Sequence, residues 1–224
     1  MPQSFNNANN AVNIFRLTEI DICDNRVQYI IAKDTILANY IRQKKCIEYY
    51  LSNNFNSLFV YTIIGQLIST KVANSIFAKF SQMCENDFSP DKILQFSQEK
   101  LRQLGMTYKK ANYILEFMQI LNNQPKYLDK IAQLPDELAI KELTTLHGIG
   151  KWTAKMMLMF YFDRPNIVPV EDLAFVKGYN HLYNTNQTPA QIAKHFKKFE
   201  PYMSIASRYI YAYADDTFGN VPKL

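Results

Sequence analysis

The residues best suited to chemistry lie between positions 143 and 175. His147-Gly148-Ile149-Gly150 separates two predicted helices, the second of which begins at Lys151. Two glycines one residue apart leave the backbone bare and free to adopt a positive φ. The N–H groups at the start of the second helix carry the positive end of its dipole, so this turn is suited to binding a phosphate. The simpler alternative is a glycine-capped corner between helices, because Gly-x-Gly alone is weak evidence.

A pair of carboxylates, Glu171 and Asp172, follows Pro169-Val170 at the start of the next predicted helix. Helix capping is the commoner role of an aspartate in this position. The helix dipole also favours the charged form of a carboxylate there, so capping and a catalytic role are compatible. Beside the glycines, Lys151 adds positive charge and Thr153 adds a hydroxyl donor.

The elements that must position these residues are predicted to be helical, so the fold class is all-α. Asp34 can cap a helix whose apolar residues run from Ile36 to Ile47 and Tyr50. Apolar pairs between 57 and 80 predict a buried helical stripe. Gly65 can end one helix there and Ser69 can cap the next, which leaves 66–68 as a short exposed turn. A further helix is expected to start at Ser89-Pro90-Asp91, and others are expected at 98–104, 109–121, 134–146, 151–161, 189–199 and 202–214.

The N-terminal part of the sequence differs from the rest. Residues 1–13 are nearly all small or polar and predict a flexible tail. Residues 14–32 contain β-branched and aromatic residues, among them Ile30 and Ile31, and predict a short strand or hairpin. We therefore divide the chain into an N-terminal extension, 1–33, and one helical domain, 34–224.

Composition agrees with a globular protein. The 224 residues are 48% hydrophobic and carry a net charge of +5, which is compatible with nucleic acid but does not establish it. The sequence contains neither the pattern of a signal peptide nor an apolar run that could span a membrane. We expect an intracellular protein, in the cytoplasm with the nucleoid or in the nucleus, that does not contact a membrane.

Cysteine and histidine usage argues against a metal centre. Three cysteines are one too few for an all-cysteine iron–sulfur cluster, and they predict free thiols: Cys23, Cys46 and Cys84. The three histidines are too far apart in the sequence for zinc spacing: His147, His181 and His195. We expect no cofactor and no metal bound by side chains.

The longer string at 146–154, Leu-His-Gly-Ile-Gly-Lys-Trp-Thr-Ala, resembles the hairpin of the helix-hairpin-helix DNA glycosylase superfamily, with the hairpin at about 138–161. In that hairpin backbone amides bind a DNA phosphate, and main-chain carbonyls can hold an alkali ion. The resemblance implies a Na⁺ or K⁺ site on the backbone near Leu146 and Gly148. It assigns DNA contacts to His147, Gly148, Gly150, Lys151 and Thr153. The segment Pro169–Asp172 resembles the loop that presents the family's aspartate, which gives Asp172 the catalytic position.

The segment Gly65-Gln66-Leu67-Ile68-Ser69 resembles the part of the alkyl-base glycosylases that precedes a DNA-facing helix. Leu67 matches the leucine that wedges into the duplex, and Gln66 and Ser69 flank it as DNA contacts. The alternative is that Leu67 is an ordinary core residue. The resemblance covers about 34–215 and is nearest to the 3-methyladenine DNA glycosylase II family, in a short form. It implies a two-lobed helical fold.

A second part of the resemblance is less complete. The segment 199–211 resembles a motif that reads Trp-x-Pro-Tyr-Arg-Ser-x-Ala. This chain has Phe199 in place of the tryptophan and Met203 in place of the arginine, which weakens any assignment of DNA contacts there.

The resemblance also predicts which reaction occurs. Relatives of the endonuclease III type use a hairpin lysine directly before the Thr-Ala pair, where this chain has Trp152. Lys151 is one residue early and points about 100° away on a helix. We therefore expect base removal without strand cleavage. Asp172 would stabilise the positive sugar, and an aromatic ring would attract the cationic alkylated base. Trp152 is the first candidate for that ring, unless it is a core aromatic, followed by Tyr61, Tyr161 and Phe162.

The functional prediction is a monomeric, monofunctional glycosylase that excises alkylated purines from double-stranded DNA in base excision repair. The accepted lesion stays open among 3-methyladenine, 7-methylguanine and hypoxanthine. Three alternatives also stay open: a non-catalytic DNA-binding module, a glycosylase for another damaged base, and a helical scaffold whose Gly-x-Gly is only a cap.

Overall fold

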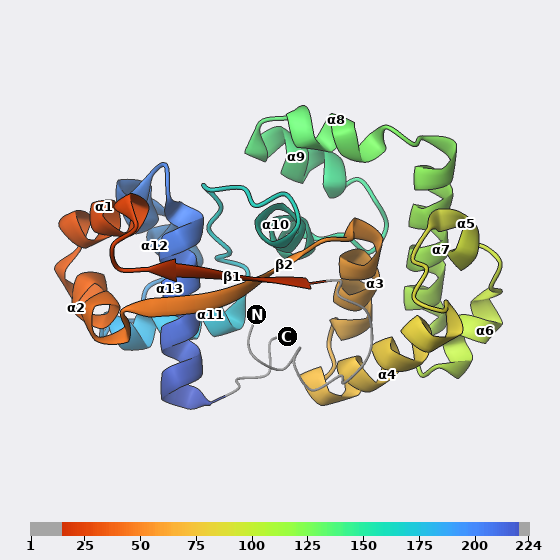
Figure 1. Cartoon of the computed structure of the whole chain (residues 1–224), viewed down its shortest axis with the longest axis horizontal. Coiled ribbons are helices and arrows are strands. Elements are labelled where there is room, and N and C mark those ends of the chain that lie inside the picture. The colour runs from red at the N-terminus through yellow and green to blue at the C-terminus, as the bar shows by residue number, and fades with distance from the viewer. Residues whose placement is uncertain (1–14, 220–224) are drawn as a thin grey trace.

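The computed structural model describes residues 15–219, and the tail predicted at 1–13 lies outside them. Most of the described residues are helical, as predicted, and one small antiparallel sheet accompanies the helices (Figure 1). Its strands are β1 (Phe15–Asp21) and β2 (Cys46–Ser52), with Ile20 opposite Ile47. No helix within 15–219 has the length and apolar character needed to cross a bilayer.

Two separate hydrophobic cores divide the structure into two lobes, as predicted. The middle lobe takes its core from residues 55–167. The terminal lobe combines both ends of the chain, with a core from 20–51 and 168–211. Strand β2 contacts helices of both lobes, and Figure 1 shows the sheet lying across the front between them.

The middle lobe is a run of helices joined by short turns. Its helices are α3 (Phe55–Gly65), α4 (Thr70–Met83), α5 (Pro90–Ile93), α6 (Gln98–Gln103), α7 (Tyr108–Asn123), α8 (Tyr127–Gln133), α9 (Asp136–Leu143) and α10 (Lys151–Phe160). Gly65 ends α3 and Ser69 caps α4, both as predicted. Helix α8 was not predicted, because no side chain caps its start.

The terminal lobe packs helices from both ends of the chain against the sheet. They are α1 (Asn25–Lys33), α2 (Thr35–Lys44), α11 (Leu173–Leu182), α12 (Pro189–Phe196), a short 3₁₀ helix (Lys197–Phe199) and α13 (Met203–Phe218). Val27 and Ile30 of α1 are fully buried, so the N-terminal extension contributes directly to this core.

The short strand predicted within 14–32 is present as β1, but two details near the N-terminus are wrong. Ile30 and Ile31 lie in α1 and not in a strand, because Asp24 caps a helix there by accepting the Arg26 N–H at 2.8 Å. Ile47 and Tyr50 lie in β2 and not in the helix that Asp34 caps. That helix ends at Lys44, since Lys45 adopts a left-handed φ of 63° and the residues after it pair with β1.

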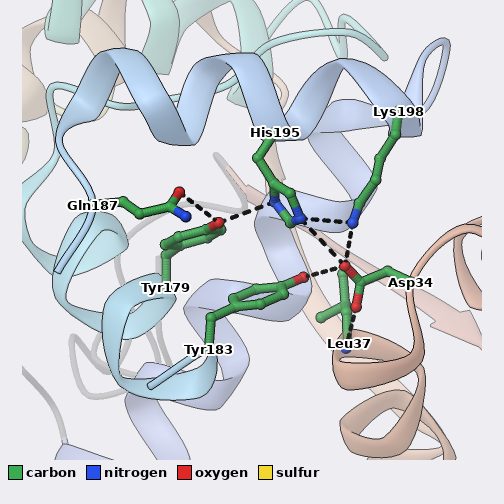
Figure 2. A network of polar contacts seen from close by, with 7 residues as sticks. All are labelled: Asp34, Leu37, Tyr179, Tyr183, Gln187, His195 and Lys198. Atoms are coloured by element: carbon green, nitrogen blue, oxygen red, sulfur yellow. Dashed lines mark hydrogen bonds and ion pairs between the residues drawn. The ribbon is translucent and has the colours of Figure 1, made fainter. Parts of the chain in front are cut away.

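A buried polar network fastens α2 to the C-terminal helices (Figure 2). Asp34 Oδ2 accepts hydrogen bonds from the Tyr183 hydroxyl at 2.9 Å and from the Lys198 ammonium. Lys198 Nζ also lies 2.6 Å from His195 Nε2, and His195 Nδ1 lies 3.0 Å from the Tyr179 hydroxyl. Burial, and then the neighbouring Lys198 charge, lower the pKa of His195. A neutral imidazole that accepts at Nε2 and donates at Nδ1 satisfies all of these contacts.

Candidate active site

The turn between α9 and α10 has the backbone that its glycines predict, although only one of them uses a positive φ. Gly148 has φ +81°, and a Cβ there would lie 2.3 Å from a ring carbon of Tyr113. Gly150 has φ −86°, and no heavy atom lies within 4 Å of the position of its Cβ. Gly148 therefore permits a tight turn against α7, while Gly150 keeps the approach to α10 open.

The start of α10 is suited to an anion. No side chain caps this helix, whose N-cap is Gly150. Its first N–H groups have no intrahelical acceptor, and the helix dipole adds partial positive charge to them. Lys151 is exposed at the same end. His147 is exposed too, with Nδ1 2.9 Å from a carboxylate oxygen of Glu116.

The Thr153 hydroxyl, predicted to contact DNA, faces the protein interior in this structure. Thr153 is buried, at 2% exposure, so the DNA contact of its hydroxyl stays a prediction. Its Oγ1 instead lies 3.4 Å from the amide nitrogen of Gln66, which also donates to the Gly148 carbonyl at 2.9 Å. The Gln66 side chain therefore links the 65–69 segment to the hairpin through these contacts.

The 65–68 segment is a turn that presents Leu67 to solvent. Gln66 has φ −58° and ψ 126°, Leu67 has φ 58°, and the Ile68 N–H lies 3.5 Å from the Gly65 carbonyl. These are the dihedral angles of a type II turn, in which glycine is preferred at the position that Leu67 occupies. Leu67 is 88% exposed, which excludes the interpretation that it is a core residue. Ser69 caps α4 with its hydroxyl 3.4 Å from the Val72 nitrogen.

Asp172 is buried, at 3% exposure, and both of its oxygens have two donors. Oδ1 accepts the N–H groups of Ala174 at 2.8 Å and Phe175 at 3.4 Å, which caps α11. Oδ2 accepts the Trp152 indole N–H and the Tyr211 hydroxyl, both at 2.9 Å. Donors of this kind stabilise a carboxylate in its charged form. Capping and a site for chemistry thus coexist at Asp172.

Tyr211 was not predicted as a site residue. It lies on α13, 39 residues after Asp172. The motif at 199–211 includes Tyr211 but does not indicate that its hydroxyl has a role. Burial, and then the negative charge of Asp172, raise the pKa of Tyr211 well above its ordinary value. The phenol therefore remains a neutral donor at physiological pH.

These three side chains bring the two lobes together. Trp152 comes from α10 of the middle lobe, whereas Asp172 and Tyr211 belong to the terminal lobe. Lys155, one turn after Trp152, ties the intervening loop to α10. Its ammonium donates to the Val168 carbonyl at 2.8 Å and pairs with Glu171 at 2.8 Å. The position of Asp172 is thus fixed from both lobes.

The other aromatic candidates lie in the packing of the middle lobe. The Tyr61 hydroxyl donates to Asn74 at 2.9 Å, and burial raises the pKa of Tyr61 to about 12. Tyr161 packs edge-on against Phe55, with ring centroids 5.1 Å apart, and against Phe162 at 4.9 Å. Trp152 is the predicted aromatic that the structure brings to Asp172.

The described residues do not form a side-chain metal site. No group of three or more potential ligands occurs within 15–219. The carbonyl of Leu146 accepts the Ile149 N–H at 3.2 Å, and that of Gly148 accepts the Gln66 amide. Each of these oxygens accepts one hydrogen bond and keeps a second lone pair, so the backbone Na⁺ or K⁺ implied by the resemblance stays a prediction, and we assign no step to it.

Comparisons with known proteins identify the family. Residues 60–201 match the model of the "HhH-GPD superfamily base excision DNA repair protein" family. DNA-3-methyladenine glycosylase 1 of Schizosaccharomyces pombe is 26% identical over 157 residues, which are 68% of this chain and 69% of that protein.

Solved structures show the same fold. The DNA-3-methyladenine glycosidase of Bacillus halodurans superposes with a TM-score of 0.80 at 25% identity, covering 90% of this chain and 94% of that one. The Schizosaccharomyces pombe 3-methyladenine DNA glycosylase in complex with abasic DNA superposes with a TM-score of 0.61 at 24% identity, covering 71% and 80%. Since the family model spans well over half of the sequence, this chain belongs to the HhH-GPD superfamily of base excision DNA repair proteins.

Proposed function

We propose that this chain is a monofunctional DNA glycosylase that excises alkylated purines from double-stranded DNA and leaves an abasic site. One observation carries the proposal: a buried carboxylate, Asp172, has four donors at the junction of two lobes, next to an uncapped helix start that suits a phosphate. The names of the relatives support the substrate class, since they are 3-methyladenine glycosylases.

The first step is extrusion of the damaged nucleotide. A base inside the duplex is out of reach and must be flipped into a pocket. The amides at the start of α10 and the charge of Lys151 would hold a backbone phosphate. Leu67, exposed on its turn, would enter the duplex in place of the flipped base.

The second step is hydrolysis of the glycosidic bond. Alkylation of a ring nitrogen makes the purine cationic, so the bond to C1′ breaks with its electron pair leaving on the base. Asp172 stabilises the positive charge that develops on the sugar. Water then forms the new bond to C1′ and releases a proton to solvent. The ring of Trp152, fixed by its hydrogen bond to Asp172, offers a π face to the cationic base.

Strand cleavage is not expected. A lyase reaction needs an amine that forms a Schiff base with the sugar. The residue before Thr153 is Trp152, which occupies the position that a nucleophilic lysine would need. Lys155 is engaged with Glu171 and the Val168 carbonyl. The hairpin residues therefore support hydrolysis without strand cleavage. We propose in addition that the protein acts as a monomer on damaged duplex.

The proposal is tested by incubating the protein with methylated duplex DNA. Free bases are separated by chromatography, and the strand is analysed before and after alkali. Free methylpurines with a strand that breaks only after alkali would support the proposal. Salt-sensitive DNA binding without base release would instead support a non-catalytic module, with Asp172 acting as a helix cap alone.

A further inference from the structure

The backbone of the turn that carries Leu67 is strained, and the Leu67 side chain does not stabilise it. A residue with a Cβ and φ near +58° is less favourable than one in ordinary backbone conformation. Leu67 is almost fully exposed, so its packing does not repay this cost. Contacts from neighbouring elements must therefore hold the turn in place.

Lys110 of α7 supplies the strongest of these contacts. Its ammonium donates to the carbonyl of Ile64 at 2.8 Å and to the carbonyl of Gln66 at 2.6 Å. The Ile64 carbonyl is one of those that a helix leaves without a partner at its C-terminal end, where the dipole is negative. The Gln66 carbonyl belongs to the peptide bond that leads directly into Leu67. One cation thus closes the end of α3 and fixes the start of the turn.

The second contact comes from the hairpin. The Gln66 side chain donates to the Gly148 carbonyl at 2.9 Å, so the backbone of Gln66 is held by Lys110 and its side chain by the hairpin. A cavity of about 550 Å³ lies between these elements, lined by Leu67, Lys109, Lys110 and Tyr113 among others. This cavity opens to solvent, and the hydrogen bonds from Lys110 to the Gln66 carbonyl and from the Gln66 side chain to Gly148 hold the turn at its edge.

We propose that Lys110 is a positioning residue that holds Leu67 in the orientation needed to enter DNA beside a flipped base. Its contribution is preorganisation: the strained turn is already formed before DNA arrives, so binding does not have to order it. Lys110 is only partly exposed and its ammonium points to the turn, which distinguishes it from a lysine that contacts phosphates. The inference rests on the proposed function, because a wedge serves only a protein that flips a base.

Lys109 provides a matched control. It carries the same charge, precedes Lys110 in the sequence and lines the same cavity. It is exposed, and its ammonium lies 5.9 Å from the centre of the Tyr113 ring, not on the turn. Lys109→Met and Lys110→Met remove equal charge, so any difference between them reports the hydrogen bonds to the turn.

The test measures binding to two duplexes of the same sequence, one undamaged and one with a stable tetrahydrofuran abasic analogue. Lys110→Met and Leu67→Ala should each weaken binding to the abasic analogue about tenfold, the scale of one hydrogen bond to a charged group. The double variant should lose no more than either single variant, because both changes act through the same side chain. Lys109→Met should weaken binding to both duplexes equally, with a shallower salt dependence.

Two results would overturn the inference: a Lys110→Met loss that is equal on both duplexes, or a double variant in which the two losses multiply to about a hundredfold. Thermal unfolding identifies a misfolded variant, in which case Lys110→Gln, which keeps one amide donor, takes its place. Measuring methylpurine release by the wild type separates a failure of the proposed glycosylase function from a failure of the proposed role of Lys110. Absence of release would contradict the proposed function, whereas release together with wild-type binding by Lys110→Met would contradict the role of Lys110 alone.

Discussion

Tyr211→Phe removes one oxygen atom from the candidate site and leaves the ring in place. The Tyr211 hydroxyl is one of two donors on Asp172 Oδ2 and one of four on the whole carboxylate. A hydrogen bond to a charged group contributes about 1.5–3 kcal/mol. Because Asp172 is buried, water does not readily replace the lost donor. We expect the midpoint of thermal unfolding to fall by about 3–12 °C.

The same change should slow base release. If the Tyr211 hydroxyl holds the charged carboxylate in position, single-turnover release of methylpurine should fall by about tenfold or more, which corresponds to about 1.4 kcal/mol. Binding to undamaged duplex should stay within about twofold of wild type, since the Tyr211 hydroxyl is buried against Asp172 and the helix start proposed to hold a phosphate is unchanged.

The control is Tyr213→Phe, two residues further along α13. It removes the same atom from a hydroxyl that lies 2.7 Å from His181 Nδ1, away from Asp172. This variant should release base at the wild-type rate. Equal stability and equal release in Tyr211→Phe and Tyr213→Phe would refute the reasoning, because the hydrogen bond to Asp172 would then contribute nothing.

Two further predictions concern the hairpin and the polar network of the terminal lobe. Gly148→Ala should lower the unfolding midpoint, because its methyl group would clash with the Tyr113 ring at a positive φ. Gly150→Ala, which meets no neighbour, should keep the wild-type midpoint and lose affinity for duplex DNA in an anisotropy titration. The lowered pKa of His195 means that the unfolded chain binds more protons than the folded one near its ordinary value of 6.5. The free energy of unfolding should therefore fall as pH drops below about 6.5, by at most about 1.4 kcal/mol per pH unit from this group. In urea titrations His195→Gln should flatten that dependence, and an unchanged slope would contradict the network with Lys198.

Local signals in the sequence predicted much of this fold. A glycine at the end of a helix and a serine at its start mark helix boundaries through local backbone geometry and hydrogen bonds. The end of α3 at Gly65 and the starts of α4 at Ser69 and α5 at Ser89 were therefore predicted correctly. The sheet was harder to predict. Segment 46–52 continues an apolar pattern that also suits a helix, and only pairing with 15–21 decides between the two.

The candidate site was predictable where its residues adjoin in the sequence. The family resemblance pointed to Asp172, Trp152 and Leu67 as candidate site residues. The exposed turn at 66–68 was predicted because Gly65 ends one helix and Ser69 caps the next. Tyr211 and Lys110 were missed because their roles depend on hydrogen bonds to distant segments, to Asp172 and to the turn of Leu67. The contact between the Thr153 hydroxyl and the Gln66 side chain was missed for the same reason, since Gln66 is remote in the sequence.

The most direct test of the central claim compares the two adjacent carboxylates. Asp172→Asn and Glu171→Gln make the same chemical change one residue apart, in a buried carboxylate with four donors and in a more exposed one paired with Lys155. Release of methylpurine from methylated duplex would be measured for both, alongside the wild type. We expect the rate of methylpurine release to fall at least about a hundredfold in Asp172→Asn and less than about tenfold in Glu171→Gln. Near-wild-type release by Asp172→Asn, in a variant that folds normally, would contradict the central claim.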